Sequence, residues 1–203
     1  VYGEFSGKAA AGKMEAQRLT EPLDVFKDTA HTGHINTIAD SSGGISVGVE
    51  SSGVIRRGLA SFDYEGRQIN SFSWEIYRLY VQKTEGREPD MGIIPLDGWN
   101  RFRIDYAGGP GSYEAVPFHL VLSGQLPPEY FEGSIVLVGP YTVGISNDTY
   151  YTPLDHQAPM FGVEIHANII ETLLYGNFKQ DLPSLVNILI LVVFGLAVFV
   201  FFS

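Results

Sequence analysis

The sequence predicts an α/β protein with a mixed sheet and flanking helices, followed by one transmembrane α-helix. Three patterns support this fold class: short alternating or β-branched runs typical of strands, two segments whose apolar residues have helical spacing, and a long apolar segment near the C-terminus. The hydrophobic fraction of 45% and the charged fraction of 18% are typical of a chain that folds around a core. A length of 203 residues leaves room for one ordinary domain.

The chain is acidic and contains no cysteine. Twenty-three acidic side chains against thirteen basic ones give a net charge of −10. This charge repels the phosphates of nucleic acids and of anionic lipid headgroups, so we expect no nucleic acid partner. The lack of cysteine excludes disulfides and thiolate metal sites within the chain.

The long apolar segment covers residues 185–202, where Asn187 is the only polar side chain and Gly195 is neutral. About 18 to 20 residues with a rise of about 1.5 Å each cover the roughly 30 Å of membrane hydrocarbon. We therefore predict a membrane-spanning helix over residues 183–203, with Pro183 in its first turn, where no amide hydrogen is needed. The alternative is a helix buried in the core of a soluble domain.

The first half of the chain predicts strands and one helix. Residues 45–49 alternate between apolar and polar side chains, and residues 54–62 alternate more weakly, as strands do. Residues 63–66 have the composition of a hairpin turn. Residues 72–82 carry apolar side chains at helical spacing, which predicts a helix with one buried face.

The middle of the chain predicts two more strands around a short helix. Residues 101–106 alternate, which predicts a strand with Arg101 and Arg103 on one face. These arginines could bind an acidic ligand, although pairing with surface carboxylates is the commoner use. Residues 117–122 predict a short helix. Residues 134–139 form a continuous β-branched run, which predicts a central strand buried on both faces.

A polar loop and a helix are expected to follow this strand. Residues 140–161 are predicted to form a loop that carries most of the polar chemistry of the chain. Residues 162–174 then predict an amphipathic helix, which Gly176 is well placed to end. The predicted apolar face carries Val163, Ala167, Ile170 and Leu174, and the opposite face carries Glu164, Asn168 and Glu171.

Several of these motifs together resemble the CHASE domain of type 2, over roughly residues 30–176. The similarity is strongest in the C-terminal core, which has the run Ile135-Val136-Leu137-Val138-Gly139, then Gly144, Asp148, Thr152-Pro153 and residues 162–170. Earlier matches are Gly33-His34, residues 53–57 and residues 104–106. The resemblance implies an extracytoplasmic sensor domain of a bacterial receptor.

The resemblance also implies how such a sensor is used. It implies a module between a preceding transmembrane helix and several following ones, feeding histidine kinases, adenylate or diguanylate cyclases, or serine/threonine kinases. On this basis we expect a receptor in the cell membrane, with its soluble part periplasmic or extracellular. The expected partners are an unknown small-molecule ligand, the bilayer and a second copy of the receptor. We expect no catalytic residue and no cofactor in this chain.

We predict four parts, which are residues 1–29 as a partial N-terminal part of the sensor domain, 30–176 as the sensor domain, 177–182 as a linker and 183–203 as the transmembrane helix. Because the family's preceding helix and an output domain are missing, we expect the chain to be a fragment of a receptor. A linker of this length keeps the sensor domain mechanically close to the membrane, so that ligand binding can act on the helix.

The predicted ligand site is the polar loop after residues 134–139, because open α/β sheets place ligands beyond the carboxyl ends of their strands. Its predicted ligand-binding residues are Asp148, Thr152, Asn147, Tyr151 and His156. Asp148 could accept hydrogen bonds from a cationic or hydroxylated ligand. The alternative is that Asp148 and Thr152 only cap turns or the next helix.

A second hypothesis is a membrane-anchored, metal-dependent hydrolase that uses Asp148 and His156. Imidazole and carboxylate groups suit zinc or manganese, and Glu164 and His166 are further candidates. The spacing argues against a metal site, because Glu164 and His166 are two residues apart on a helix and point in different directions. We expect His166, which lies beside the apolar stripe, to be a hydrogen-bonded core histidine.

Overall fold

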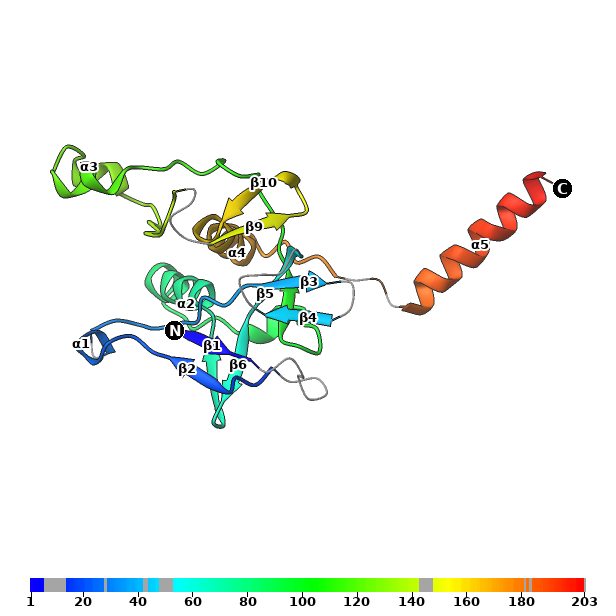
Figure 1. Ribbon diagram of the computed structural model, residues 1–203, viewed down its shortest axis with the longest axis horizontal. Helices are drawn as coiled ribbons and strands as arrows, with labels where there is room; N and C mark the ends of the chain where they lie inside the picture. The colour runs from blue at the N-terminus through cyan, green and yellow to red at the C-terminus, as the bar shows by residue number, and fades with distance from the viewer. Residues whose placement is uncertain are drawn as a thin grey trace.

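The computed structural model describes residues 1–5, 14–27, 29–41, 44–47, 53–142, 148–180, 182 and 184–202. Figure 1 shows a folded body from which one long helix, α5 (Ser184–Phe202), projects. In chain order, the elements of the body are β1 (Tyr2–Glu4), β2 (Arg18–Thr20), α1 (Asp24–Lys27), β3 (Ile38–Ser41), β4 (Gly44–Val47), β5 (Val54–Leu59), β6 (Ser61–Tyr64), β7 (Arg67–Asn70), α2 (Phe72–Glu85), a 3₁₀ turn (Met91–Ile93), β8 (Arg101–Arg103), α3 (Phe118–Leu122), a second 3₁₀ turn (Pro128–Phe131), β9 (Thr149–Thr152), β10 (Asp155–Phe161) and α4 (Gly162–Tyr175).

The largest sheet is mixed and has helices beside it, which confirms the predicted fold class. Its strand order is β10-β9-β5-β3-β4, and β8 also pairs with β5. β5 and β9 run parallel, whereas the other pairs in this sheet are antiparallel. Because β5 pairs with three strands, it forms the centre of the sheet. Helices α2 and α4 pack against each other.

Most of the local predictions for helices, turns and strands of the body are confirmed. The predicted turn at residues 63–66 joins β6 to β7, with Glu65 and Gly66 at positive φ values of 49° and 75°. Positive φ values at two successive residues are typical of a type I′ turn, and the twist of this turn suits a hairpin with a two-residue loop. The three predicted helices of the body correspond to α2, α3 and α4. The predicted strands at residues 45–49 and 54–62 correspond to β4 and to β5 with β6, with residues 48 and 49 outside the described residues. The strand predicted at residues 101–106 is shorter, because β8 ends at Arg103.

Two groups of buried side chains hold the body together. The larger group joins the large sheet to α2 and α4, and it includes Trp74, Phe102 and Ile165. The smaller group includes Met14 and Phe62, so the N-terminal segment contributes to the core. Burying a side chain of this size contributes about 1.5–3 kcal/mol, which makes these contacts the main source of stability.

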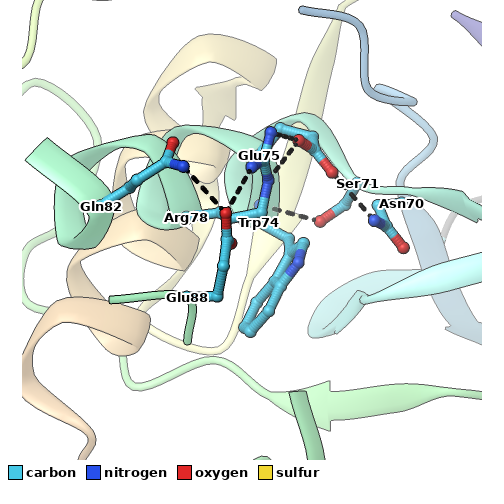
Figure 2. Close-up of polar contacts among 7 residues, drawn as sticks. All are labelled: Asn70, Ser71, Trp74, Glu75, Arg78, Gln82 and Glu88. Atoms are coloured by element: carbon cyan, nitrogen blue, oxygen red, sulfur yellow. Dashed lines mark hydrogen bonds and ion pairs between the residues drawn. The ribbon is translucent and has the colours of Figure 1, made fainter. Parts of the chain in front are cut away.

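Polar contacts fix the start and the outer side of α2. Ser71 Oγ accepts a hydrogen bond from the Trp74 amide at 3.1 Å and so caps the helix. Arg78 donates to Glu75 at 2.9 Å and to Glu88 at 3.4 Å, and Figure 2 shows Arg78 between these two carboxylates. The ion pairs therefore hold the segment after the helix against its side.

Replacing Ser71 with alanine is expected to lower the free energy of unfolding by about 1 kcal/mol, because the Trp74 amide would lose its acceptor. Urea unfolding of the full chain in a neutral detergent, followed by tryptophan fluorescence, measures this loss. Ser123→Ala, at the exposed end of α3, is the control and should change the value by less than about 0.5 kcal/mol. Equal losses in the two variants would contradict the capping role of Ser71.

The predicted central strand at residues 134–139 is wrong. This segment has no regular secondary structure, and Val136 and Val138 are 53% and 76% exposed. The central position belongs to β5, and no described strand forms a ladder with residues 134–139. A β-branched run forms a buried strand only where neighbouring strands supply hydrogen bonds, and composition does not reveal whether they do.

The predicted loop at residues 140–161 is wrong in its second half. Residues 149–161 form the hairpin of β9 and β10, with Thr152 opposite Asp155. The overlooked signal is the run Thr149-Tyr150-Tyr151-Thr152, because threonine and tyrosine favour strands. Pro153, which suits a turn, directly follows this run. Residues 143–147 lie outside the described residues.

Helix α5 lies apart from the body (Figure 1). Its side chains are exposed along its length, with Leu185 at 81% and Phe201 at 83%. This exposure contradicts the alternative of a helix buried in the core. The segment from Leu185 to Phe202 is long and apolar enough to cross a membrane. Pro183, which the sequence predicts in the first turn of this helix, is outside the described residues.

Candidate functional site

Asp148 lies half-buried at the N-terminal end of α4. Its carbonyl oxygen accepts a hydrogen bond from the Gly162 amide at 3.0 Å. Its carboxylate lies so close to Gly162 that a β-carbon at that position would collide with it. Burial raises the pKa of the Asp148 carboxyl, and a hydrogen bond from Tyr150 acts in the opposite direction. Asp148 therefore contacts the first residue of α4 directly.

The other predicted ligand residues that the structure describes, Thr152, Tyr151 and His156, differ in burial. Alternation along β9 places Thr152 inside and fully buried, and Tyr151 outside with 41% exposure. His156 is exposed on β10, and Asn147 lies outside the described residues. The Thr152 hydroxyl has no hydrogen-bond partner among the described residues. The structure thus separates Tyr151 and Thr152 onto opposite faces of one strand.

The polar face of α4 is buried, contrary to the expectation that Glu164 and Asn168 lie away from the core. These two residues are 2% and 0% exposed, and Thr172 is 2% exposed. Residues at positions i, i+4 and i+8 form one row along a helix. This row of Glu164, Asn168 and Thr172, which we call the polar ladder, contacts the segment of residues 105–113.

Each residue of the polar ladder accepts a hydrogen bond from one backbone amide of segment 105–113. The pairs are Thr172 Oγ1 with the Asp105 amide at 3.1 Å, Asn168 Oδ1 with the Ala107 amide at 3.0 Å, and Glu164 Oε1 with the Gly111 amide at 2.8 Å. Tyr113 extends the contact by donating to Glu171 at 2.8 Å. Because the three acceptors on α4 are buried polar groups that need donors, these bonds fix the path of the segment along the helix.

Glu164 is a buried carboxylate that accepts hydrogen bonds from three parts of the body. Besides the Gly111 amide, it accepts from the Phe161 amide at 3.2 Å and from the Tyr141 hydroxyl at 3.3 Å. Its position in the first turn of α4 also suits a negative charge, because the helix dipole is positive there. Segment 105–113, the end of β10 and the residue Tyr141 therefore meet at Glu164, in the first turn of α4.

Segment 105–113 also contacts the linker to α5. Lys179 Nζ donates a hydrogen bond to Asp105 Oδ1. Phe178 packs edge-on against Phe102, with ring centroids 6.2 Å apart. Helix α4 ends before Gly176, as predicted, and the φ of 66° at this glycine is a left-handed conformation that terminates helices. Asp105 is therefore bonded to α4 through its amide and to the linker through its carboxylate.

His166 is a hydrogen-bonded histidine in the interior, as predicted. Its Nδ1 lies 3.0 Å from Ser73 Oγ, and its ring meets Phe72 edge-on. His34 is 1% exposed, its ring packs on Phe62, and neither ring nitrogen has a partner among the described residues. Burial lowers the pKa of His34 to about 3 and the pKa of His166 to about 4. Both rings are therefore neutral at physiological pH.

Arg101 is paired with a carboxylate, although inside the protein and not at its surface. It is 9% exposed, and its Nε lies 2.9 Å from Asp97 Oδ2. The same carboxylate oxygen lies 3.9 Å from the Nε of Arg57. Asp97 also accepts a hydrogen bond from the Arg101 amide at 3.0 Å, which fixes the start of β8. Arg101 therefore serves the fold and is not available to an acidic ligand.

The structure gives no support to a metal-dependent hydrolase within the described residues. There, no group of three histidine, aspartate or glutamate side chains lies close enough together to hold a metal ion. His156 is exposed on β10, whereas Asp148 is half-buried against Gly162, and His166 contacts Ser73.

The chain matches the family model of the CHASE2 domain over residues 8–201. This match is longer than the resemblance over residues 30–176, because it includes most of the N-terminal segment and of α5. Comparisons with curated proteins and with solved structures found no match. Because the family match covers nearly the whole chain, the protein belongs to the CHASE2 family of extracytoplasmic sensor domains.

Proposed function

We propose that this chain is the ligand-sensing input domain of a bacterial transmembrane receptor. In this proposal α5 spans the cell membrane, the body lies in the periplasm or outside the cell, and a bound small molecule controls a cytoplasmic kinase or nucleotide cyclase. The chain itself catalyses no reaction. Membership of the CHASE2 family supports the sensing role, and the length and apolar character of α5 support its place in the membrane.

The observation that carries this proposal is a continuous bonded path from the start of α4 to the linker. The polar ladder joins α4 to segment 105–113, and Asp105 joins that segment to Lys179. Only residues 176–183 lie between α4 and α5, and they reach at most about 29 Å when fully extended. A displacement of α4 therefore acts on α5 over a short distance.

The N-terminal end of α4 is the proposed site of ligand binding. A cationic or hydroxylated small molecule that contacts Asp148 would act on α4 directly, because Asp148 is bonded to Gly162. Asn147 precedes Asp148 in the sequence and stays a predicted ligand residue, although it lies outside the described residues. The ligand shifts α4 only by the difference between its affinities for the two positions of the helix.

Inserting Gly-Ser-Gly-Ser between Lys179 and Gln180 is expected to uncouple the body from α5. The measurement is the output activity of the full-length receptor in cells that grow in a panel of media with different small molecules. The insertion should reduce the ratio of the highest to the lowest activity by about tenfold, which is a typical strength of coupling between two sites.

The matched control is the same insertion after Gly124, in the exposed turn that follows α3. This control should leave the activity ratio unchanged, because the turn is remote from α4 and the linker in the chain and lies on an outer part of the body (Figure 1). An unchanged ratio after the insertion in the linker would reject mechanical coupling between α4 and α5.

A further inference from the structure

A shallow cavity of about 610 Å³, broadly open to solvent, lies where the body meets α5. Its lining comes from three parts of the chain: the neighbouring strands β5 and β8, the linker, and the first turn of α5. The lining residues are Arg57, Arg103, Lys179, Gln180, Leu182 and Asn187. Three of these side chains are cationic, and among the described residues no acidic side chain lines the cavity.

The sheet brings two of the cationic side chains together. Arg57 on β5 and Arg103 on β8 are directly opposite each other in the antiparallel register. Opposed side chains lie on the same face of a sheet, where like charges repel. Lys179 brings a third positive charge from the linker. Each of these cations also has an interaction within the chain, with Asp97 for Arg57 and Asp105 for Lys179, so an anion in the cavity would join existing contacts.

The position of the cavity along α5 indicates the source of such an anion. Leu182 precedes α5, and Asn187 lies in its first turn, so the cavity is at the end of the apolar segment. Each headgroup layer of a bilayer is roughly 5–7 Å thick, beside a hydrocarbon core of about 30 Å. A helix that spans this core places the cavity at the level of the lipid phosphates.

We propose that this cavity binds the phosphate group of an anionic membrane phospholipid. Guanidinium groups match the geometry of phosphate oxygens, and the ammonium of Lys179 adds charge that attracts the headgroup. The apolar surface of α5 accommodates the acyl chains of the same molecule. This inference rests on the proposed place of α5 in the membrane. It assigns lipid contact to one local site in a chain whose net charge of −10 otherwise repels anionic lipids.

The test is a titration of the full chain, in neutral detergent micelles, with short-chain phosphatidylglycerol as the probe. Lys179→Gln is expected to weaken binding roughly fivefold, and the double variant Arg103→Gln with Lys179→Gln roughly 30-fold. Lys83→Gln, near the exposed end of α2, removes the same charge elsewhere and should leave the affinity unchanged. Asp105→Asn breaks the bond to Lys179 but keeps the cation, so it should not weaken binding.

Two competition measurements distinguish an anionic phospholipid from a neutral lipid and from a free phosphate ion. Short-chain phosphatidylcholine should bind at least about fivefold more weakly, because it carries no net charge. Inorganic phosphate should not displace phosphatidylglycerol at equal concentration. Displacement by phosphate, or an affinity that Lys179→Gln and the double variant leave unchanged, would overturn the proposal. Flotation of the chain with phosphatidylcholine vesicles tests the membrane placement of α5 separately, so a chain that floats but does not prefer phosphatidylglycerol refutes only the lipid site.

Discussion

Acidification from about pH 7.5 to about pH 5 is expected to lower the free energy of unfolding by about 4 kcal/mol through two buried histidines. The pKa is about 3 for His34 and about 4 for His166 in the folded protein, compared with an ordinary value of 6.5. Below about pH 6.5 the unfolded chain therefore binds protons that the folded protein excludes. Each histidine costs about 1.4 kcal/mol per pH unit in this window, or about 2 kcal/mol by about pH 5.

The sign of this effect follows from the lowered pKa values. The stability that neutral His34 and His166 provide is fully present above about pH 6.5. It is lost progressively as the pH falls from about 6.5 to about 3, and it does not change further at lower pH. Asp148, whose pKa is raised by burial, acts with the opposite sign, because its contribution is present at low pH and lost as the pH rises.

Urea unfolding of the full chain in neutral detergent, at several values between about pH 5 and about pH 7.5, measures this dependence. His34→Met keeps an apolar side chain of similar size without a titrating ring, so it should halve the slope of stability against pH. His31→Met, at an exposed position three residues earlier, is the matched control and should leave the slope unchanged. A slope that His34→Met does not alter would contradict the role of this histidine.

Features that depend on neighbouring residues could be predicted from the sequence. Helices α2 and α4 follow from apolar side chains three and four residues apart, and Gly176 follows the last of them. The turn at Glu65 and Gly66 and the apolar helix α5 are equally local. Each feature is determined within one or two turns of the chain, so composition and spacing are sufficient to find it.

Features that depend on distant partners could not be predicted in this way. Residues 134–139 have the composition of a buried strand, yet the centre of the sheet is β5, which carries Arg56 and Arg57. From the sequence, the polar side chain of Asn168 is expected to face solvent. Its burial could not be predicted, because its hydrogen-bond partner, the Ala107 amide, is 61 residues away in the chain. In the candidate ligand site, only the fold shows that Thr152 faces inward.

Replacing Asn168 with alanine is expected to lower the free energy of unfolding by about 3 kcal/mol. Asn168 Oδ1 accepts from the Ala107 amide at 3.0 Å, and its Nδ2 donates to the Glu164 carbonyl at 2.9 Å. Alanine would remove both hydrogen bonds of the Asn168 side chain, which is fully buried, at a cost of about 1–3 kcal/mol. It would also leave a cavity beside Met160, which Asn168 contacts. Asn177→Ala, at an exposed position just beyond α4, is the matched control for urea unfolding and should cost less than about 0.5 kcal/mol.

The same variant separates a structural role of the polar ladder from a role in coupling. If the ladder carries the displacement of α4 to Asp105, Asn168→Ala should reduce the activity ratio of the full-length receptor at a temperature where the variant is still folded. Ser71→Ala destabilises α2 but keeps every bond of the ladder, so it should preserve that ratio. An equal reduction in both variants would show that loss of stability, and not loss of the ladder, weakens the signal. A reduction confined to Asn168→Ala would instead place segment 105–113 on the path from the ligand to the membrane, because that segment is what the variant releases.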